Sequence, residues 1–335
     1  MVDPDNRTMR YFCTCFDQFF LPRGLALYAS LCRYCNAFTL YVFCHDHETF
    51  DYFTKHPHEG LVPIPISDVE ISQPGLQEAR ANRSRIEFYF TCTPALPLHI
   101  FGMYHHIDLI SYIDADFFFY SSPESLYREF ANGSIGIIAH RYAFGARRFG
   151  KFGIYNVGWL MFRRDDQALS CLRWWRDRCI EWCYDRYEDG KFADQKYLDE
   201  WPDRFKGVVV LEHKGVNVAG WNIRNYRITE QDSMICIDGI PLICFHFAGF
   251  KEVRPYIYKT GFAGFFMWPS RIVRRKIFEP YIQTLSKFGS ESIGRRIRKS
   301  DTHMASFRKS LRNIIRMLRS IIFCDYLWYF RGRIW

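Results

Sequence analysis

Short apolar segments alternate with segments of helical spacing along most of this 335-residue chain, and this alternation restricts the fold more than any other feature. Leu25, Tyr28 and Leu31 recur at the spacing of one helix face, whereas Leu109–Ile113 is apolar almost throughout. A strand that is almost wholly apolar is buried on both faces, as in a parallel sheet covered by helices. The pattern therefore predicts an α/β fold, a mostly parallel sheet flanked by helices.

The predicted elements follow one another through the first 250 residues. Strands are expected at 11–16, 39–44, 61–66, 109–113, 134–139, 155–162, 208–211 and within 234–247. Helices are expected at 21–34, 48–55, 76–91, 94–104, 123–130 and 165–187. The stretch 142–153 is rich in Gly and Arg and is predicted to form a mobile loop.

Positive charge is concentrated in the C-terminal part of the chain. Residues 251–335 contain 19 Lys and Arg against 5 Asp and Glu, whereas residues 1–250 contain 26 against 31. Within the basic part, apolar residues recur at helical spacing, namely Phe307, Leu311, Ile314, Ile315, Leu318, Ile321 and Ile322. Two domains are therefore expected: a main domain over residues 1–255 and a basic, aromatic-rich helical tail over 256–335.

The tail has the composition of an interfacial membrane anchor. Its polar face carries basic residues (Arg308, Lys309, Arg312, Arg316 and Arg319), and aromatic residues follow it (Tyr326, Trp328, Tyr329, Phe330 and Trp335). Apolar burial combined with attraction to anionic lipid would hold such a helix on a membrane surface. Packing of the helix against the main domain is the alternative. Nucleic acid is not an expected partner, because the remainder of the chain is acidic and has no recognition motif.

No stretch approaches the roughly 20 apolar residues that span a bilayer, and the first residues are polar. We therefore expect a cytoplasmic protein that is peripheral on the inner face of a membrane, with its 12 cysteines as thiols. Cys13, Cys15, Cys32 and Cys35 could form a four-sulfur zinc site. Their positions within a predicted strand and helix favour packing instead.

Acidic residues follow two of the predicted strands. Asp114 and Asp116 come directly after 109–113, and Asp17 follows 11–16. In an α/β sheet, ligands bind beyond the carboxyl ends of the strands. Two carboxylates one residue apart at such a position suit a hard divalent cation. Short acidic pairs also cap strands and helices, so the pair alone is a weak signal.

Several motifs extend this signal. The run from Ser111 to Asp116 resembles the metal-binding DxD motif of GT-A-fold glycosyltransferases. The later motifs are similar, in the same order, to those of retaining family 8, which includes glycogenin and bacterial lipopolysaccharide galactosyltransferases. They are Tyr155–Gly158, Phe192–Gln195 with Tyr197 and Leu198, and His246–Gly249, preceded by an opening strand at Cys13–Asp17. The resemblance covers roughly residues 9–252.

The resemblance implies a role for each matching residue. The metal ligands would be Asp114, Asp116 and His246, and this donor set suits Mn²⁺ somewhat better than Mg²⁺. The donor nucleotide would meet Thr14 and Asp17, and its phosphate or sugar would meet Arg83, with Arg80 and Arg85 as alternatives. The donor sugar and reacting centre would face Asn156, Asp194 and Gln195. Lys251 would neutralise the diphosphate, although family members usually place this lysine one residue further along and before Pro-Trp.

The activity implied is transfer of a hexose, with retention, from a nucleoside diphosphate sugar such as a UDP-sugar to a cell-surface glycan or a lipid-linked acceptor. An inverting transferase with Asp194 as general base and a catalytically silent glycan- or membrane-binding protein are the alternatives.

Ordinary structural roles stay open for several of these residues. Asn156 could satisfy backbone groups, Asp194 could cap a helix, and His246 could lie in the core. Trp221 and Asn222 could pack in the core or form an acceptor-sugar platform. The remaining histidines considered are expected in turns or at the surface, namely His45, His47, His105 and His106.

Overall fold

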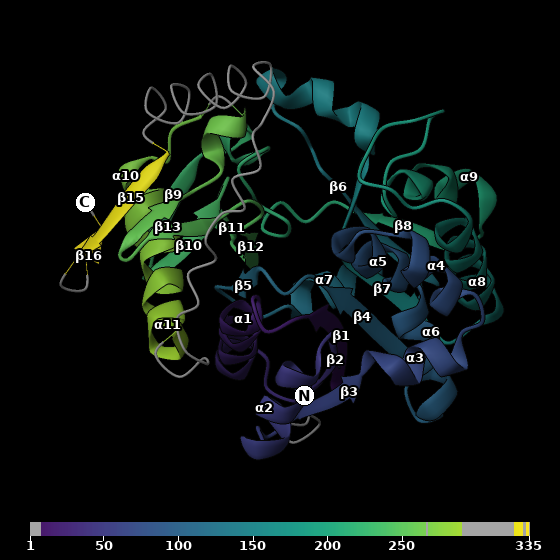
Figure 1. The fold of residues 1–335 in the computed structure, drawn as a ribbon. Helices are drawn as coiled ribbons and strands as arrows, with labels where there is room; N and C mark the ends of the chain where they lie inside the picture. The colour runs from purple at the N-terminus through teal and green to yellow at the C-terminus, as the bar shows by residue number, and fades with distance from the viewer. Residues whose placement is uncertain (1–7, 266, 290–324, 331–332, 335) are drawn as a thin grey trace, which may run out of the picture.

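The computed structural model describes residues 8–265, 267–289, 325–330 and 333–334 (Figure 1). The amphipathic pattern at 307–322 lies outside the described residues. In the described part of the chain, no helix combines the length and the apolar character that crossing a membrane requires.

A seven-stranded mixed sheet forms the centre, in the order β3-β2-β1-β4-β7-β6-β8. Its strands are β1 (Arg10–Phe16), β2 (Phe38–Cys44), β3 (Leu61–Pro65), β4 (Leu109–Ile113), β6 (Ile135–Ala139), β7 (Tyr155–Arg163) and β8 (Val208–Leu211). β3, β2, β1 and β4 are parallel neighbours, β7 is antiparallel to β4 and β6, and β8 is parallel to β6. The predicted α/β architecture with a mostly parallel sheet is confirmed.

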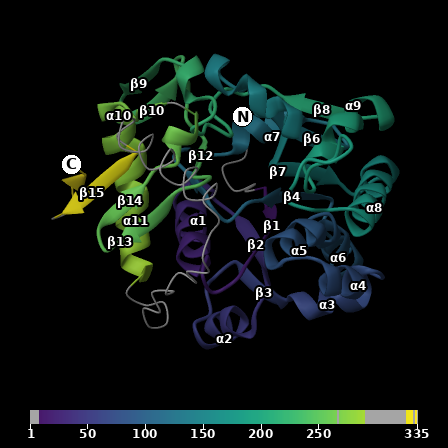
Figure 2. The same ribbon diagram turned by 45° about the horizontal axis from the view of Figure 1, so that its top comes forward.

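Helices cover both faces of this sheet, as Figures 1 and 2 show. One face is covered by α1 (Leu21–Tyr34), α2 (His47–Lys55) and α7 (Glu124–Phe130). The other is covered by α3 (Ile66–Ser72), α4 (Leu76–Asn82), α5 (Arg85–Cys92), α6 (Ala95–Met103), α8 (Asp166–Glu181), α9 (Trp201–Arg204) and the 3₁₀ helix η2 (Lys196–Glu200). Neighbouring β1 residues point to opposite cores, because Phe12 belongs to the first and Cys13 to the second.

A short antiparallel pair extends the region just after β4. β5 (Phe117–Phe119) follows the acidic pair directly and hydrogen-bonds to β12 (Cys244–His246), so that Phe117 lies opposite His246. Further short elements lead into β12, namely η3 (Ile223–Asn225), β9 (Ile228–Gln231), β10 (Met234–Ile237) and β11 (Ile240–Pro241). The single segment expected within 234–247 is thus three short strands separated by turns.

The C-terminal elements pack on the rest of the molecule. They are β13 (Lys251–Arg254), β14 (Ile257–Lys259), η4 (Phe262–Phe265), α10 (Arg271–Val273), the π-helix η5 (Arg274–Phe278), α11 (Glu279–Gly289), β15 (Tyr326–Phe330) and β16 (Arg333–Ile334). α11 lies against α1, and its Tyr281 contacts Phe118 of β5 at 5.5 Å between ring centroids. β15 pairs with β14, so the aromatic end of the predicted helical tail is extended. The domain boundary at 255 stays a prediction.

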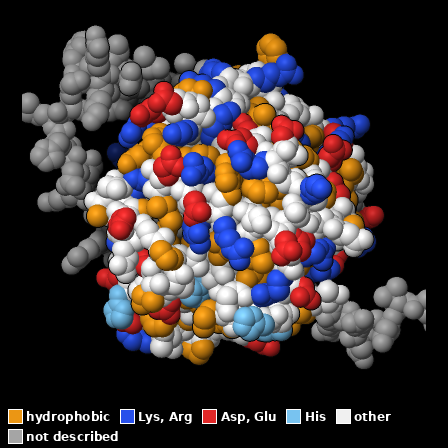
Figure 3. All heavy atoms as spheres, turned by 90° about the vertical axis from the view of Figure 1, so that its right-hand side faces the viewer, with side chains coloured by type: hydrophobic (Ala, Val, Ile, Leu, Met, Phe, Trp, Pro, Cys, Tyr) orange, Lys and Arg blue, Asp and Glu red, His pale blue; other side chains and the backbone are white. Residues whose placement is uncertain are grey.

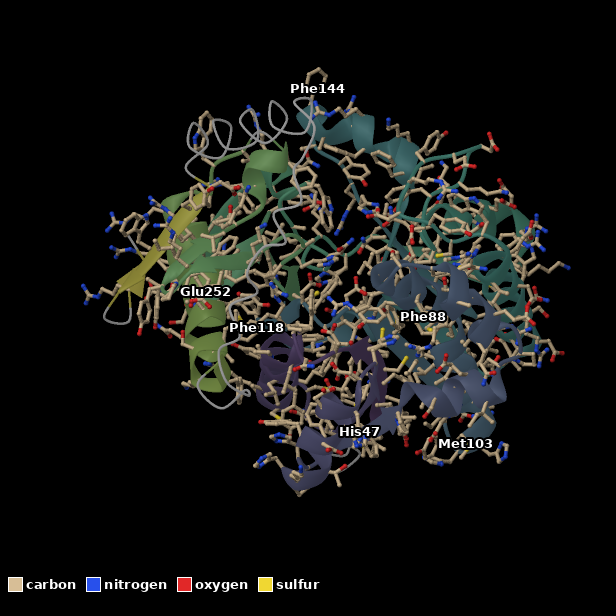
Figure 4. All side chains as sticks on the ribbon, viewed as in Figure 1. His47, Phe88, Met103, Phe118, Phe144 and Glu252 are labelled. Carbon is tan, nitrogen blue, oxygen red and sulfur yellow. The ribbon has the colours of Figure 1, made fainter. Side chains whose placement is uncertain are left out.

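Two segments differ locally from the predicted elements. The helix expected over 76–91 is divided into α4 and α5, because Ser84 and Glu87 form a capping box that starts a new helix. The predicted loop at 142–153 contains the 3₁₀ helix η1 (Phe144–Phe152), whose first residue projects into solvent in Figure 4 and is 85% exposed. The helix expected over 165–187 ends at Glu181.

Candidate active site

Two carboxylates and one imidazole converge at the carboxyl end of β4. The Nε2 atom of His246 lies 3.1 Å from Oδ1 of Asp116 and 3.7 Å from Oδ2 of Asp114. One ligand atom from each of the three residues lies within 4.8 Å of the others. Among the Asp, Glu, His and Cys side chains of the described residues, these three form the group that could hold a metal ion.

The pairing of β5 with β12 and a glycine in β7 allow this convergence. Phe117 stacks on the His246 ring with 4.3 Å between the centroids, and the Gly158 carbonyl accepts a 2.9 Å hydrogen bond from the Asp114 amide. A Cβ atom at Gly158 would lie 2.5 Å from Oδ1 of Asn156 and 2.9 Å from Cε1 of His246. Because those approaches are too close for any side chain, the final glycine of the Tyr155–Gly158 motif is required by packing.

The chemistry of the three groups fits a divalent cation. Nδ1 of His246 lies 3.4 Å from Oδ1 of Asn217, so donation to this amide directs the Nε2 lone pair toward the two carboxylates. A positive charge between the imidazole lone pair and the two carboxylates would stabilise this arrangement. Burial lowers the pKa of His246, but Asp116 and Asp114 outweigh burial and raise it overall. Burial raises the pKa of Asp114 to about 6 against the opposing effect of His246, and Tyr112 donates a 2.8 Å hydrogen bond to its Oδ1.

A cavity of about 350 Å³ opens beside the two aspartates. Asp17 lines it and is buried, accepting a hydrogen bond from the Tyr89 hydroxyl at 2.9 Å and pairing with Nη1 of Arg85 at 3.2 Å. The backbone amide of Phe19 donates to its other oxygen at 3.0 Å. The cavity therefore combines a fixed carboxylate with a guanidinium close to the candidate metal ligands.

Two predicted donor contacts lie away from this cavity. Thr14 points to the opposite face of β1 from Cys15, which lines the cavity, and its hydroxyl is buried without a hydrogen-bond partner among the described residues. Arg83 donates to the Tyr184 hydroxyl at 2.5 Å and to the Ile180 carbonyl at 3.1 Å.

The structure therefore places Arg85, one of the two alternatives, at the cavity in place of Arg83. The other alternative, Arg80, pairs with Glu70 at 2.6 Å and does not line the cavity. The Ser84–Glu87 capping pattern was the sequence signal that could have separated Arg83 from Arg85, since it places a helix boundary between them.

A second cavity of about 860 Å³ adjoins the first. Asn156 and Gln195 line both, and His246 lines the larger one. The Asn156 amide nitrogen lies 3.1 Å from Nε2 of His140, and its oxygen accepts the Gly158 amide at 3.0 Å. Gln195 donates to the Phe152 carbonyl at 3.1 Å. Both amides are thus held at the junction of the cavities. Asn156 satisfies a backbone group, as its structural alternative required, and it also lines the cavities.

Asp194 lies buried in the wall of the smaller cavity. Burial, with the charge of Asp114 as the next cause, raises the pKa of its carboxyl to about 8. It does not cap a helix, because the N-cap of η2 is Gln195. The preceding Ala193 has a φ of +46°, in the left-handed region that favours glycine. Such strain is common where a side chain is held in a functional position.

The predicted acceptor and leaving-group residues differ in placement. Trp221 lines the larger cavity, with its ring edge-on to His246 at 5.1 Å between centroids. Asn222 is fully buried, is bonded to backbone groups of Ala219, His140 and Asn217, and lines neither cavity. Lys251 is exposed on β13 and lines neither cavity.

Sequence reasoning missed three supporting residues. Tyr112 and Tyr89 hold Asp114 and Asp17, and His140 holds Asn156. Tyr112 could have been found, because residues two apart on a strand share a face and it precedes Asp114 by two. His45 was expected at the surface or in a turn; it lies in the bend between β2 and α2, but it is buried and stacks on Tyr89 at 3.8 Å between ring centroids. It follows β2, and helix α5 covers it.

Comparison with known proteins agrees with this architecture. No family model matches the chain. The uncharacterized protein YfnD of Bacillus subtilis (strain 168) is 28% identical over 287 residues, which cover 84% of this chain and 90% of YfnD. The galactosyltransferase LgtC, solved with donor and acceptor sugar analogues, matches with a TM-score of 0.50 and 13% identity over 83% of this chain and 95% of its own.

The bifunctional glycosyltransferase WbbM matches with a TM-score of 0.51 and 13% identity over 87% of this chain, which spans 52% of the WbbM chain. At this level of identity the likeness concerns the fold, which is that of the GT-A glycosyltransferases.

Proposed function

We propose that this chain is a metal-dependent glycosyltransferase that moves a hexose from a nucleoside diphosphate sugar to a hydroxyl group of a glycan or lipid-linked acceptor. The observation that carries the proposal is the meeting of two cavities at Asn156 and Gln195, beside the Asp114–Asp116–His246 cluster. Group transfer requires two substrates to meet at one bond. The smaller cavity then holds the donor and the larger one the acceptor.

The donor side carries groups that suit a nucleotide diphosphate. Asp17 offers carboxylate oxygens for the hydroxyl or N–H groups of a nucleoside, and Tyr89 holds it in place. Arg85 supplies a guanidinium for the phosphates, the role first expected of Arg83. Cys15 and Asp17, not Thr14, present side chains to the cavity. A uridine nucleotide is the proposed donor base, on the family resemblance.

The acidic cluster would hold the metal. Asp114, Asp116 and His246 offer two carboxylates and one imidazole nitrogen, a donor set that suits Mn²⁺, with Mg²⁺ as the alternative. A divalent cation bound there would stabilise the negative charge that develops on the leaving diphosphate. Arg85 adds a fixed positive charge at the donor cavity, and the exposed position of Lys251 leaves it no contact there.

The transfer breaks the bond between the anomeric carbon and the diphosphate oxygen and forms one to the acceptor oxygen, whose proton is released. We propose that Asn156 and Gln195 orient the sugar, because their amides line both cavities. Asp194 lines the donor cavity but not the acceptor cavity. A carboxylate on the donor side is poorly placed to take a proton from the acceptor. This favours retention over an inverting mechanism with Asp194 as base, and the anomeric configuration of the product, read by NMR, decides between them.

The decisive experiment is hydrolysis or transfer with a panel of nucleotide sugars. We expect one donor to be turned over with Mn²⁺ and not with EDTA, and Asp116→Ala to lower the rate on the order of 100-fold or more. Asp203→Ala, an exposed carboxylate on α9, is the matched control and should keep the wild-type rate. Equal rates with Mn²⁺, with EDTA and in Asp116→Ala would contradict the metal-dependent mechanism. No turnover of any donor, together with no donor-dependent thermal shift, would favour the silent binding protein.

We also propose, from the sequence alone, that the basic tail brings the enzyme to the inner face of a membrane. Vesicles that contain anionic lipid should bind the chain, and binding should fall as salt screens the basic residues. Replacing Arg308, Lys309, Arg312, Arg316 and Arg319 by Gln should abolish this binding. Vesicle binding that survives those replacements would contradict the proposal.

A further inference from the structure

A third cavity, of about 290 Å³, lies outside the two reaction cavities and shares no lining residue with them. Its walls come from α8, the turn at 188–191, η2 and α9. Four cations line it from these four elements: Arg178, Lys191, Lys196 and Arg204. Two acidic residues, Asp189 and Glu200, also line it, so the walls carry a net charge of about two positive units by the ordinary charges of these groups.

The concentration of charge is local. Figure 3 shows the face of the molecule that carries α8 and α9, where basic and acidic side chains are interspersed. Three of the cations have ion-pair partners: Arg178 with Glu181 at 2.6 Å, Lys196 with Asp199 at 2.7 Å, and Arg204 with Glu200 at 2.8 Å. The Arg178–Glu181 and Arg204–Glu200 pairs are exposed, and such pairs stabilise by about 1 kcal/mol or less, so an incoming anion can compete with them or join them. The Lys196–Asp199 pair is half-buried.

Lys191 differs from the other three cations. It forms no ion pair with any described residue. The turn that carries it is closed by reciprocal backbone hydrogen bonds between Glu188 and Lys191, of 3.1 and 2.8 Å. Asp189 and Gly190 at its tip have φ values of +48° and +74°, as a two-residue hairpin turn requires. A tight turn therefore presents at the cavity an ammonium group that has no ion-pair partner among the described residues and lies 5.8 Å from the centroid of the Trp182 ring.

Aromatic rings form the rest of the wall. The guanidinium of Arg204 lies over the Trp174 ring, 4.5 Å from its centroid, and Trp174 meets the Tyr197 ring edge-on at 6.1 Å. The Tyr197 hydroxyl donates to the Trp182 carbonyl at 2.7 Å, which fixes this side chain. The cavity has the volume of roughly ten liquid water molecules, more than a bare phosphate group fills. Aromatic walls with cations suit a sugar that carries an anionic group.

We infer that this cavity is a binding site for an anionic sugar, that is, a phosphate- or carboxylate-bearing unit of a glycan. Arg178, Lys191 and Lys196 hold the anionic group, and Trp174 and Tyr197 contact the sugar ring. The site is separate from the reaction cavities, so its occupancy does not depend on the proposed transferase activity.

Calorimetric titration of the full chain at fixed ionic strength tests the inference. The probes are glucose 6-phosphate, glucuronate, glucose and inorganic phosphate. We expect the two anionic sugars to bind, glucose not to bind, and inorganic phosphate to bind more weakly. The double variant Arg178→Ser with Lys191→Ser should weaken binding of the anionic sugars at least tenfold.

The matched control is Arg173→Ser with Lys206→Ser, which removes the same charge at exposed positions of the same region that do not line the cavity. It should bind as the wild type does, and Lys191→Ser alone repeats the test with a single change at a half-buried position. No binding of either anionic sugar to the wild type, or equal loss in the two double variants, would overturn the inference. Inorganic phosphate binding as tightly as glucose 6-phosphate would also overturn it, because the site would then recognise a bare anion.

Discussion

At the residue scale, the geometry of the site depends on the absence of a side chain at one position as well as on the side chains that are present. Gly158 has no side chain, and this lets His246 and Asn156 approach the same point on β7. Tyr112 and His140 then fix the orientation of Asp114 and Asn156. These supporting contacts decide where the carboxylates and amides point, so they determine the geometry of the site while contributing no chemistry of their own.

His45 gives a pH dependence of stability at the same scale. Burial, with the charge of Arg80 as a smaller cause, lowers the pKa of His45 to about 3 from 6.5. As the pH falls below about 6.5, His45 becomes protonated in the unfolded chain but stays neutral in the folded chain. The free energy of unfolding therefore decreases down to about pH 3. The loss from one such group approaches about 1.4 kcal/mol per pH unit.

We therefore expect His45→Phe to lose less stability than the wild type between pH 7 and pH 5. Urea unfolding at several pH values measures the difference. His105→Phe, at an exposed position, should keep the wild-type slope. An unchanged slope in His45→Phe would show that other groups cause the acid sensitivity.

At the scale of elements, the break between α4 and α5 separates two arginines that periodicity places on one helix. Arg83 ends up extended and bonded to Tyr184 and Ile180, whereas Arg85 starts α5 and lines the donor cavity. The capping box of Ser84 and Glu87 causes the break, because it satisfies free amides of a new helix start. Helical spacing alone does not reveal such a boundary.

This arrangement predicts opposite effects for the two residues. Arg83→Ala should lower the free energy of unfolding by about 1–3 kcal/mol, because it removes the hydrogen bonds of a buried guanidinium to the Tyr184 hydroxyl and to the part-buried Ile180 carbonyl. Arg85→Ala should instead weaken binding of a nucleoside diphosphate, with a smaller effect on unfolding. Urea unfolding and nucleotide titration of both variants provide the measurements. The reverse pattern would return Arg83 to the donor contact first expected of it.

At the scale of the whole molecule, local patterns predicted most strands and helices, because their periodicity is set by short stretches of sequence. The convergence of Asp114, Asp116 and His246 was expected from motif order and is present. Thr14 lies on the face of β1 away from the cavity; alternation along the sequence shows which residues share a face but not which face the cavity opens on. Pairing of β5 with β12 joins residues more than 120 positions apart, and no local signal specifies such a contact.

The C-terminal elements raise a question about the boundary at residue 255. Tyr281 of α11 is fully buried and stacks on Phe247, next to the candidate ligand His246, with 3.7 Å between ring centroids. Residues beyond 255 therefore cover the core that supports the site. We expect Tyr281→Ala to cost about 3–5 kcal/mol of stability and to weaken Mn²⁺ binding, because the cavity beside Phe247 loosens β12.

Thermal unfolding and Mn²⁺ titration measure the two effects, and Tyr256→Ala, 59% exposed, should change neither. A chain cut after residue 255 should then fail to give the cooperative unfolding of the intact protein. If residues 1–255 alone unfold cooperatively and bind Mn²⁺ as the intact chain does, the later elements form a separate unit. Their contact with α1 would then be an interface between two domains and no part of a single core.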